Sequence, residues 1–300
     1  MYGFLLRHWI DRAAVGEGLD CAEGRGRNAF GVPPLTLARG STRAARCPRS
    51  VQPLPDHSGS VVMRFGIAVF PGTWSDRDCK HAVELSGNDA VLLWHKDRDL
   101  RGSDCIILPG GFAYGDYLRA GAVARFAPLM EAVIEFANAG GLVWGICNGF
   151  QILCEAHLLP GALTRNGSLE YRCEATWLRV ETVHSTYTAG CERGAVLQIP
   201  VSHGEGRYVA DEATLDTLER DDRVAFRYVA RDGSAVGDGS PNGSMRDIAG
   251  ILNERRNVLG MMPHPERACE DLLGSSDGLR LFGSVAKLIA ADGAVRAAVS

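Results

Sequence analysis

The sequence predicts an α/β fold, with a mostly parallel central sheet, helices on both of its faces and a strand-rich later part. From Met63 onward, short apolar stretches of strand length alternate with segments of helical apolar spacing. This alternation is typical of parallel sheets that are buried on both faces. Of the 300 residues, 46% are hydrophobic, which suffices for one large domain with a well-buried core.

The first part of this pattern contains four expected strands and three expected helices. The strands cover Phe65–Phe70, Ala90–Trp94, Cys105–Leu108 and Leu142–Ile146, and the helices cover Asp76–Ser86, Ala122–Ala139 and Asn148–His157. Ser75 or Asp76 should cap the first helix, and Gly87 should follow its end. The pair Gly140-Gly141 should end the second helix.

The later part is richer in strands, which we expect to be joined by glycine-rich turns. The strands cover Ala175–Val183, Ala195–Pro200, Arg207–Val209, Val224–Val229, Ile248–Leu252 and Val258–Met261. A closing helix is expected over Ser276–Ala290.

Residues 1–62 differ in composition from the rest of the chain. They carry eight arginines, no lysine and five acids, so their net charge is 8 − 5 = +3. Gly, Pro, Ser and Arg dominate without apolar periodicity, which favours disorder. We expect one folded domain over residues 63–300, with 1–62 a disordered extension or the product of a start upstream of Met63. The five acids argue against a transit peptide.

Composition argues against several classes of protein. The net charge of −4 gives no reason to expect nucleic acid as a partner. No apolar run approaches the roughly 20 residues of a membrane-spanning helix. The nine cysteines are odd in number and form no C-x-x-C pair, so we expect neither a zinc ribbon nor another metal site. With no export signal, this cysteine usage indicates a reducing cytoplasm.

The segment Gly145-Ile146-Cys147-Asn148-Gly149 lies between an expected strand and an expected helix. Glycines on both sides permit a tight turn, as in the nucleophile elbow of hydrolases that use serine. The helix N-terminus would favour the thiolate of Cys147. The alternative is a core cysteine between two packing glycines.

A thiol nucleophile needs a base and a group that orients the base. His264 follows the last expected strand and lies between two prolines, and Glu266 is two residues further on. In an extended backbone both side chains would point to the same side. The alternative is a surface loop with an incidental histidine and glutamate.

Leu108-Pro109-Gly110-Gly111 ends another expected strand in a glycine turn. Its bare backbone amides could donate to the oxyanion that forms during acyl transfer. Most P-G-G sequences form only a turn. The prediction of oxyanion donors here therefore rests on the position of the turn after a central strand.

These three elements occur in the order P-G-G, G-x-C-x-G-x-Q and H-P-E, which resembles the class I, triad-type glutamine amidotransferases with their flavodoxin-like fold. Further segments resemble one member, the small glutaminase subunit of phosphoribosylformylglycinamidine synthase. They are Pro109–Gly121, Gly145–Gln151 with Leu158–Gly161, His203–Gly206, Pro241–Ser244 and Met261–Arg267. The resemblance covers about residues 63–290. Trp74-Ser75 and Leu169-Glu170-Tyr171 depart from the family pattern.

The resemblance implies a role for each matching residue. Cys147 would be the nucleophile, and His264 and Glu266 the rest of the triad. The amides of Gly111 and Asn148 would bind the oxyanion. Four residues would contact substrate glutamine, namely Gly110, Gln151, Ser168 and His203.

The resemblance also implies partners. Ammonia released from glutamine would pass to a large synthetase subunit, which would bind ATP, magnesium and formylglycinamide ribonucleotide, and a small subunit would bridge the two. This chain needs no cofactor in that reading, and it has no G-x-x-x-x-G-K-[ST] phosphate loop.

Three alternatives remain from the sequence. The chain could serve another synthetase with the same triad, or it could be a DJ-1-like or peptidase-like cysteine hydrolase. It could also be a binding subunit without catalysis. Some DJ-1-like proteins carry histidine directly after the nucleophile, whereas Asn148 stands there in this chain.

Overall fold

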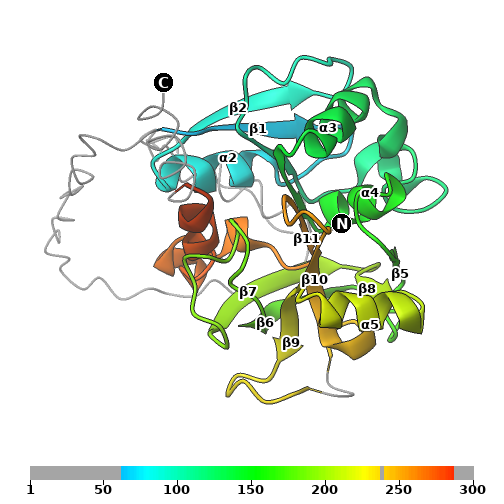
Figure 1. Ribbon diagram of the computed structural model, residues 1–300, viewed down its shortest axis with the longest axis vertical. Coiled ribbons are helices and arrows are strands. Elements are labelled where there is room, and N and C mark those ends of the chain that lie inside the picture. The colour runs from blue at the N-terminus through cyan, green and yellow to red at the C-terminus, as the bar shows by residue number, and fades with distance from the viewer. Residues whose placement is uncertain (1–61, 237–239, 287–300) are drawn as a thin grey trace, which may run out of the picture. The chain divides into compact units, whose positions relative to one another are not determined.

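The computed structural model describes residues 62–236 and 240–286 (Figure 1). The expected extension over residues 1–62 lies outside this range except for its last residue. Its disorder and the boundary at Met63 therefore stay predictions.

Nine of the described strands form one sheet in the order β2-β1-β3-β4-β11-β10-β9-β6-β7. The first five are parallel neighbours, and they are β1 (Arg64–Val69), β2 (Asp89–Trp94), β3 (Cys105–Leu108), β4 (Leu142–Ile146) and β11 (Val258–Met261). The other four are antiparallel, and they are β6 (Arg172–Val180), β7 (Val196–His203), β9 (Val224–Val229) and β10 (Ile248–Leu252). A small separate sheet pairs β5 (Ala162–Thr164) with β8 (Arg207–Val209).

Helices cover the parallel half of the sheet (Figure 1). Helix α2 (Asp76–Leu85) packs on β1 and β2, α3 (Pro128–Asn138) packs on β4, and α4 (Asn148–Glu155) packs on β3, β4 and β11. Every residue of β3 and β11 is buried, so both faces of the central strands are covered. The predicted fold class, including its strand-rich later part, is confirmed.

The single helix predicted over Ala122–Ala139 is wrong. The chain forms a short 3-10 helix, η2 (Ala124–Phe126), and then α3, with Ala127 in an extended conformation between them (ψ 144°). A proline disfavours helical geometry in the residue before it, and Pro128 therefore begins a new helix instead of continuing the first.

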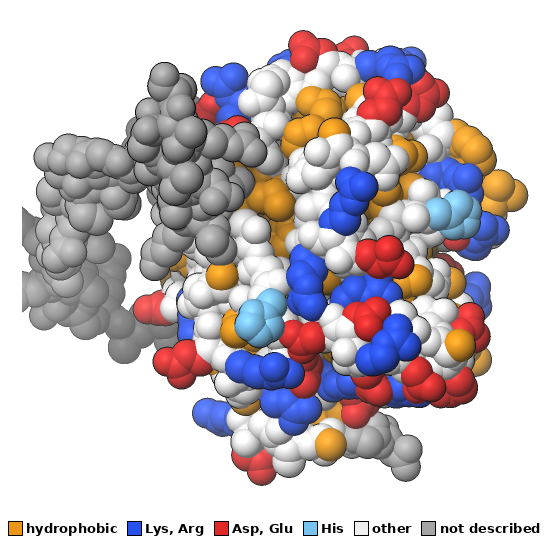
Figure 2. Space-filling model, in the orientation of Figure 1, with side chains coloured by type: hydrophobic (Ala, Val, Ile, Leu, Met, Phe, Trp, Pro, Cys, Tyr) orange, Lys and Arg blue, Asp and Glu red, His pale blue; other side chains and the backbone are white. Residues whose placement is uncertain are grey.

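The later part also contains a helix that the predicted strands and turns left out, α5 (Glu212–Arg220). Asp211 caps it by accepting a hydrogen bond from the Thr214 backbone N–H at 2.8 Å. Its polar side faces Arg246, which pairs with Glu212, Asp216 and Glu219. Figure 2 shows acidic and basic side chains interspersed over this lower part of the molecule.

Several boundaries differ from those predicted by one or two residues, and those of β6 and β7 differ by three. β6 begins and ends three residues before the predicted strand Ala175–Val183, and β7 runs on from Pro200 to His203. Residues 279–286 are helical, and the last four residues of the predicted closing helix lie outside the described part of the chain.

The two glycines of the predicted elbow allow α4 to pack closely on the sheet. A Cβ atom at Gly149 would lie 1.9 Å from the carbonyl oxygen of Leu108, and one at Gly145 would lie 2.5 Å from Cδ1 of Leu153. Real Cβ atoms do not approach other atoms so closely, so any larger residue would push helix and strand apart.

We therefore expect Gly149→Ala to lower the free energy of unfolding by about 1–3 kcal/mol or more, because the methyl group cannot be accommodated. Urea denaturation would measure the change. Gly283→Ala is the control, since no described atom lies within 4 Å of a Cβ there. It should be neutral or stabilising by about 0.5–1 kcal/mol, and equal effects of the two variants would contradict the packing argument.

Candidate active site

The three predicted site segments follow three neighbouring strands of the sheet. Gly110-Gly111 follows β3, Cys147 follows β4 and His264 follows β11, and these strands are parallel in the order β3-β4-β11. Their carboxyl ends meet at one edge, where open α/β sheets bind ligands. The fold therefore brings the predicted triad and the glycine turn together.

Cys147 forms the corner between β4 and α4, as predicted. Its backbone has φ 52° and ψ −106°, a strained conformation for a residue other than glycine. Hydrogen bonds hold the corner, because Cys147 N–H donates to Met261 O at 2.8 Å and Cys147 O accepts from Phe150 N–H at 3.0 Å. The thiol is almost buried, and it donates to the backbone oxygen of Ser202 at 3.7 Å.

His264 and Glu266 form a buried pair, with Nδ1 and Oε1 2.5 Å apart. The contact was predicted, but the extended backbone expected to produce it is wrong. Pro265–Arg267 forms a 3-10 turn, η5, and the Arg267 N–H donates to His264 O at 3.1 Å. Proline suits the first position of such a turn, and the turn brings the carboxylate back to the ring.

Electrostatics favour the charged forms of this pair. Burial alone would lower the pKa of His264, but the negative charges of Glu266 and the Cys147 thiolate outweigh it and raise the pKa to about 9. Burial would raise the pKa of Glu266, but the charge and hydrogen bond of His264 outweigh it and lower that pKa. Each partner thus stabilises the charge of the other.

The second ring nitrogen of His264 is available for the nucleophile. Nε2 is buried and has no hydrogen-bond partner among the described residues. The Cys147 thiolate is close enough to raise the pKa of His264, whereas the thiol hydrogen bond goes to Ser202 O. The Cys147 side chain therefore lies close to the imidazole.

Arg267 lies beside the His264–Glu266 pair, and the sequence had not indicated a role for it. Its Nε lies 3.5 Å from Asp78 Oδ2 and 4.0 Å from Glu266 Oε1, and its Nη2 donates to Ser75 Oγ at 3.0 Å. Ser75 precedes α2 but makes no capping bond with its side chain. The available signal was the place of Arg267 directly after the triad glutamate.

Among the described residues, the two expected oxyanion donors have no competing hydrogen-bond partner. Neither Gly111 N–H nor Asn148 N–H donates a hydrogen bond to any described residue. Gly110 O accepts from the backbone N–H groups of Trp74 and Ser75, which fixes the turn. A Cβ at Gly110 would lie 2.5 Å from Cε1 of His264, so this glycine lies against the triad. The oxyanion role itself stays a prediction.

The residues expected to contact substrate differ in their surroundings. Gln151 is buried on α4, and its Nε2 donates to Glu205 O at 2.6 Å. His203 is buried at the end of β7, and its two ring nitrogens face Asn166 Oδ1 at 3.2 Å and Asn242 Nδ2 at 3.4 Å. Burial and the charge of His264 lower the pKa of His203 to about 4. The neutral His203 ring therefore holds the turn after β7 through these two contacts. A contact between His203 and substrate stays a prediction.

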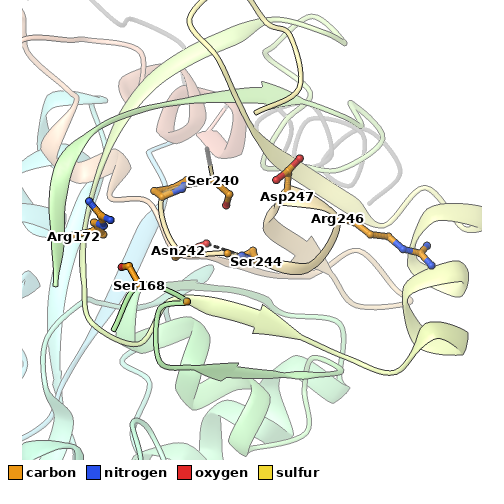
Figure 3. A pocket seen from close by; sticks show the side chains of 10 residues that line it. Ser168, Arg172, Ser240, Asn242, Ser244, Arg246 and Asp247 are labelled. Atoms are coloured by element: carbon orange, nitrogen blue, oxygen red, sulfur yellow. Dashed lines mark hydrogen bonds between the residues drawn. The ribbon is translucent and has the colours of Figure 1, made fainter. Parts of the chain in front are cut away.

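Ser168 is exposed and lines a cavity of about 480 Å³. The cavity is formed mainly by residues 167–172 and 240–247, and no triad residue lines it. In Figure 3 the Arg246 side chain points away from it toward α5, and Asn242 bonds the backbone of Ser244. Asn242 lines this cavity and also contacts the His203 ring. Cys147 does not line the cavity, which is therefore separate from the candidate catalytic centre.

Two general findings complete the description of the site. Within residues 62–236 and 240–286, no group of three His, Cys, Asp or Glu residues is placed to hold a metal ion. In the same part of the chain, no helix is both long enough and apolar enough to span a membrane.

The fold and the Cys–His–Glu arrangement define a triad-type glutamine amidotransferase. The chain belongs to the CobB/CobQ-like glutamine amidotransferase domain family, whose model matches residues 63–278.

Its relatives are more specific. It is 56% identical over 229 residues to the phosphoribosylformylglycinamidine synthase subunit PurQ of Streptomyces avermitilis, covering 76% of this chain and 98% of the relative. It is 54% identical over 224 residues to the subunit of the same name from Koribacter versatilis, covering 74% and 97%. In the solved structure of PurLQS from Thermotoga maritima, one chain matches with a TM-score of 0.68 and 41% identity, covering 76% and 100%. The resemblance seen in the sequence is confirmed.

We expect the His264–Glu266 pair to make stability depend on pH. Folding raises the pKa of His264 from 6.5 to about 9, so its contribution is complete below 6.5 and is lost as the pH rises through 9. Urea unfolding across this range would show the decline.

Glu266→Gln is the matched control for this pH dependence, because it removes the charge while keeping the shape of the side chain. The decline should be much smaller in this variant than in the wild type. An equal decline in both proteins would contradict the assignment to His264.

Proposed function

We propose that this chain is the glutaminase subunit of a phosphoribosylformylglycinamidine synthase. The observation that carries the proposal is the strained Cys147 beside the buried His264–Glu266 pair at one edge of the sheet. Identity above 50% over nearly the full length of PurQ relatives supports the choice among amidotransferases.

The arrangement accounts for hydrolysis of glutamine in two steps. The Cys147 thiolate attacks the side-chain amide carbon, while the amides of Gly111 and Asn148 stabilise the oxyanion. The His264 imidazolium protonates the departing nitrogen, so the C–N bond breaks, ammonia leaves and a glutamyl thioester remains. His264 then accepts a proton from water, whose oxygen attacks the thioester and releases glutamate and the thiolate.

The raised pKa of His264 fits the start of this cycle. An imidazolium held between Glu266 and Cys147 can donate a proton to the leaving nitrogen without first taking one from solvent. Glu266 keeps Nδ1 engaged, so Nε2 is the nitrogen that exchanges protons with the reactants.

Ammonia from this site would pass to a large synthetase subunit. That subunit would bind ATP and magnesium and convert formylglycinamide ribonucleotide to formylglycinamidine ribonucleotide, a step of de novo purine (IMP) biosynthesis. A small subunit would bridge the two, and the similar Thermotoga maritima structure is of PurLQS. We also place the protein in the cytoplasm, because all seven described cysteines are free thiols.

The two catalytic alternatives predict different behaviour. A chain that serves another synthetase would share the triad, and its glutamate release would ignore the large subunit, ATP and formylglycinamide ribonucleotide. A DJ-1-like or peptidase-like hydrolase would not release ammonia from glutamine. Glutamate release with and without that mixture therefore separates the readings, and stimulation by the mixture supports the proposal.

We expect Cys147→Ala to abolish glutamine-dependent synthesis by the complex while ammonia-dependent synthesis continues, because only the glutaminase step uses the thiol. Formylglycinamidine ribonucleotide formation with either nitrogen source would measure both activities. Cys191→Ala is the control, since this cysteine is also buried but has no place in the mechanism. Survival of glutamine use in Cys147→Ala would refute the nucleophile assignment.

A further inference from the structure

The side chain of Asn148 is buried and fully used, although the proposed mechanism needs only its backbone amide. Its exposed fraction is 1%. Oδ1 accepts from the backbone N–H of Ala113 at 3.0 Å, and Nδ2 donates to Asp116 Oδ1 at 3.1 Å and to Gln151 Oε1 at 2.9 Å. A buried amide with three bonds in good geometry fixes the segments that it joins.

The hydrogen-bond chain continues beyond Asn148. The Gln151 side chain, held by Asn148 at its oxygen, donates from its nitrogen to Glu205 O at 2.6 Å. One line of bonds therefore joins the loop after β3, the first turn of α4 and the turn after β7. Cys147 directly precedes α4, and its thiol donates to Ser202 O near the end of β7.

The loop after β3 needs such a restraint because its backbone is strained. Three successive residues are left-handed, with φ of 55° at Tyr114, 71° at Gly115 and 53° at Asp116. Conformations of this kind persist only where surrounding contacts enforce them. Asn148 bonds this loop at two points, Ala113 N–H and the Asp116 carboxylate.

The same loop carries one of the two expected oxyanion donors. Gly111 N–H lies two residues before Ala113, and the other donor is the N–H of Asn148 itself. The Asn148 side chain therefore joins the segment of one donor directly to the residue that carries the other. Two donors must be held in fixed positions to stabilise a charge that appears only in the transition state.

We propose that the Asn148 side chain is a positioning residue, which fixes the loop 110–116 against α4 so that the Gly111 and Asn148 amides converge on the oxyanion. This inference rests on the glutaminase function proposed above. It assigns a role to the side chain in addition to that of its backbone amide.

The test compares variants of the full chain, assembled with the synthetase subunit, in glutamine turnover. Asn148→Ala should lower kcat about 10- to 100-fold. This decrease is no larger than that caused by removing one oxyanion donor, because the donors are misplaced and not lost. The effect should fall mainly on kcat, since the misplaced donors act on the transition state, with a smaller rise in KM for glutamine because Gln151 loses its bond to Asn148. Asn148→Asp should not restore kcat, although a carboxylate oxygen can still accept from Ala113 N–H, because its other oxygen would face the acceptors Asp116 Oδ1 and Gln151 Oε1.

Two controls separate positioning from a general loss of structure. Asn257 is also a buried asparagine, and its Nδ2 donates to Ala137 O at 2.8 Å and Gly141 O at 2.7 Å. Asn257→Ala should lower the melting temperature without changing kcat. Alkylation of Cys147 by iodoacetamide should keep its wild-type rate in Asn148→Ala, because this reaction needs no oxyanion donor.

Several outcomes would overturn the inference. They are a kcat in Asn148→Ala no lower than in Asn257→Ala, a rise in KM alone, and a loss of Cys147 alkylation that parallels the loss of kcat. Failure of the proposed function would look different. Wild-type protein would then release no glutamate, or Cys147→Ala would retain its activity, and the inference would fall with it.

Discussion

The parallel pairing of β4 with β11 is the constraint on which the site depends. It sets Gly145 opposite Gly260 and Ile146 opposite Met261, and the Cys147 N–H extends the ladder by bonding Met261 O. A Cβ at Gly260 would lie 2.2 Å from the ring of Phe150 on α4. Nucleophile, base and helix are therefore placed by one set of close backbone contacts, which leaves little room for larger residues.

Within this frame, the site holds the His264–Glu266 ion pair away from water. A buried charge is costly unless it is paired, and here the pairing extends from Cys147 through His264 and Glu266 to Arg267 and Asp78. From His264 to Asp78 these charges alternate in sign. Arg267 ties the catalytic pair to the start of α2 through Ser75 and Asp78.

Neutral polar side chains hold the loops around the site, in contrast to the charged His264–Glu266 pair at its centre. Asn148 and Gln151 bond the strained loop after β3 and the turn after β7, and His203 is kept neutral between Asn166 and Asn242. Neutral amides can fix a backbone without adding a charge that would compete with the oxyanion.

The sequence by itself determined the alternation of strands and helices, the glycine-flanked elbow at Cys147 and the local pair of His264 and Glu266, because each depends on residues close together in the chain. Pro128 and Asp211 carried readable signals for the break before α3 and the start of α5, and those signals were missed. Only the tertiary structure decided the roles of the Asn148 side chain, His203 and Arg267. Asn148 bonds Ala113, 35 residues away, His203 faces Asn166, 37 residues away, and Arg267 pairs with Asp78, 189 residues away. No local spacing encodes such contacts, because they exist only once the sheet has brought distant loops to one edge.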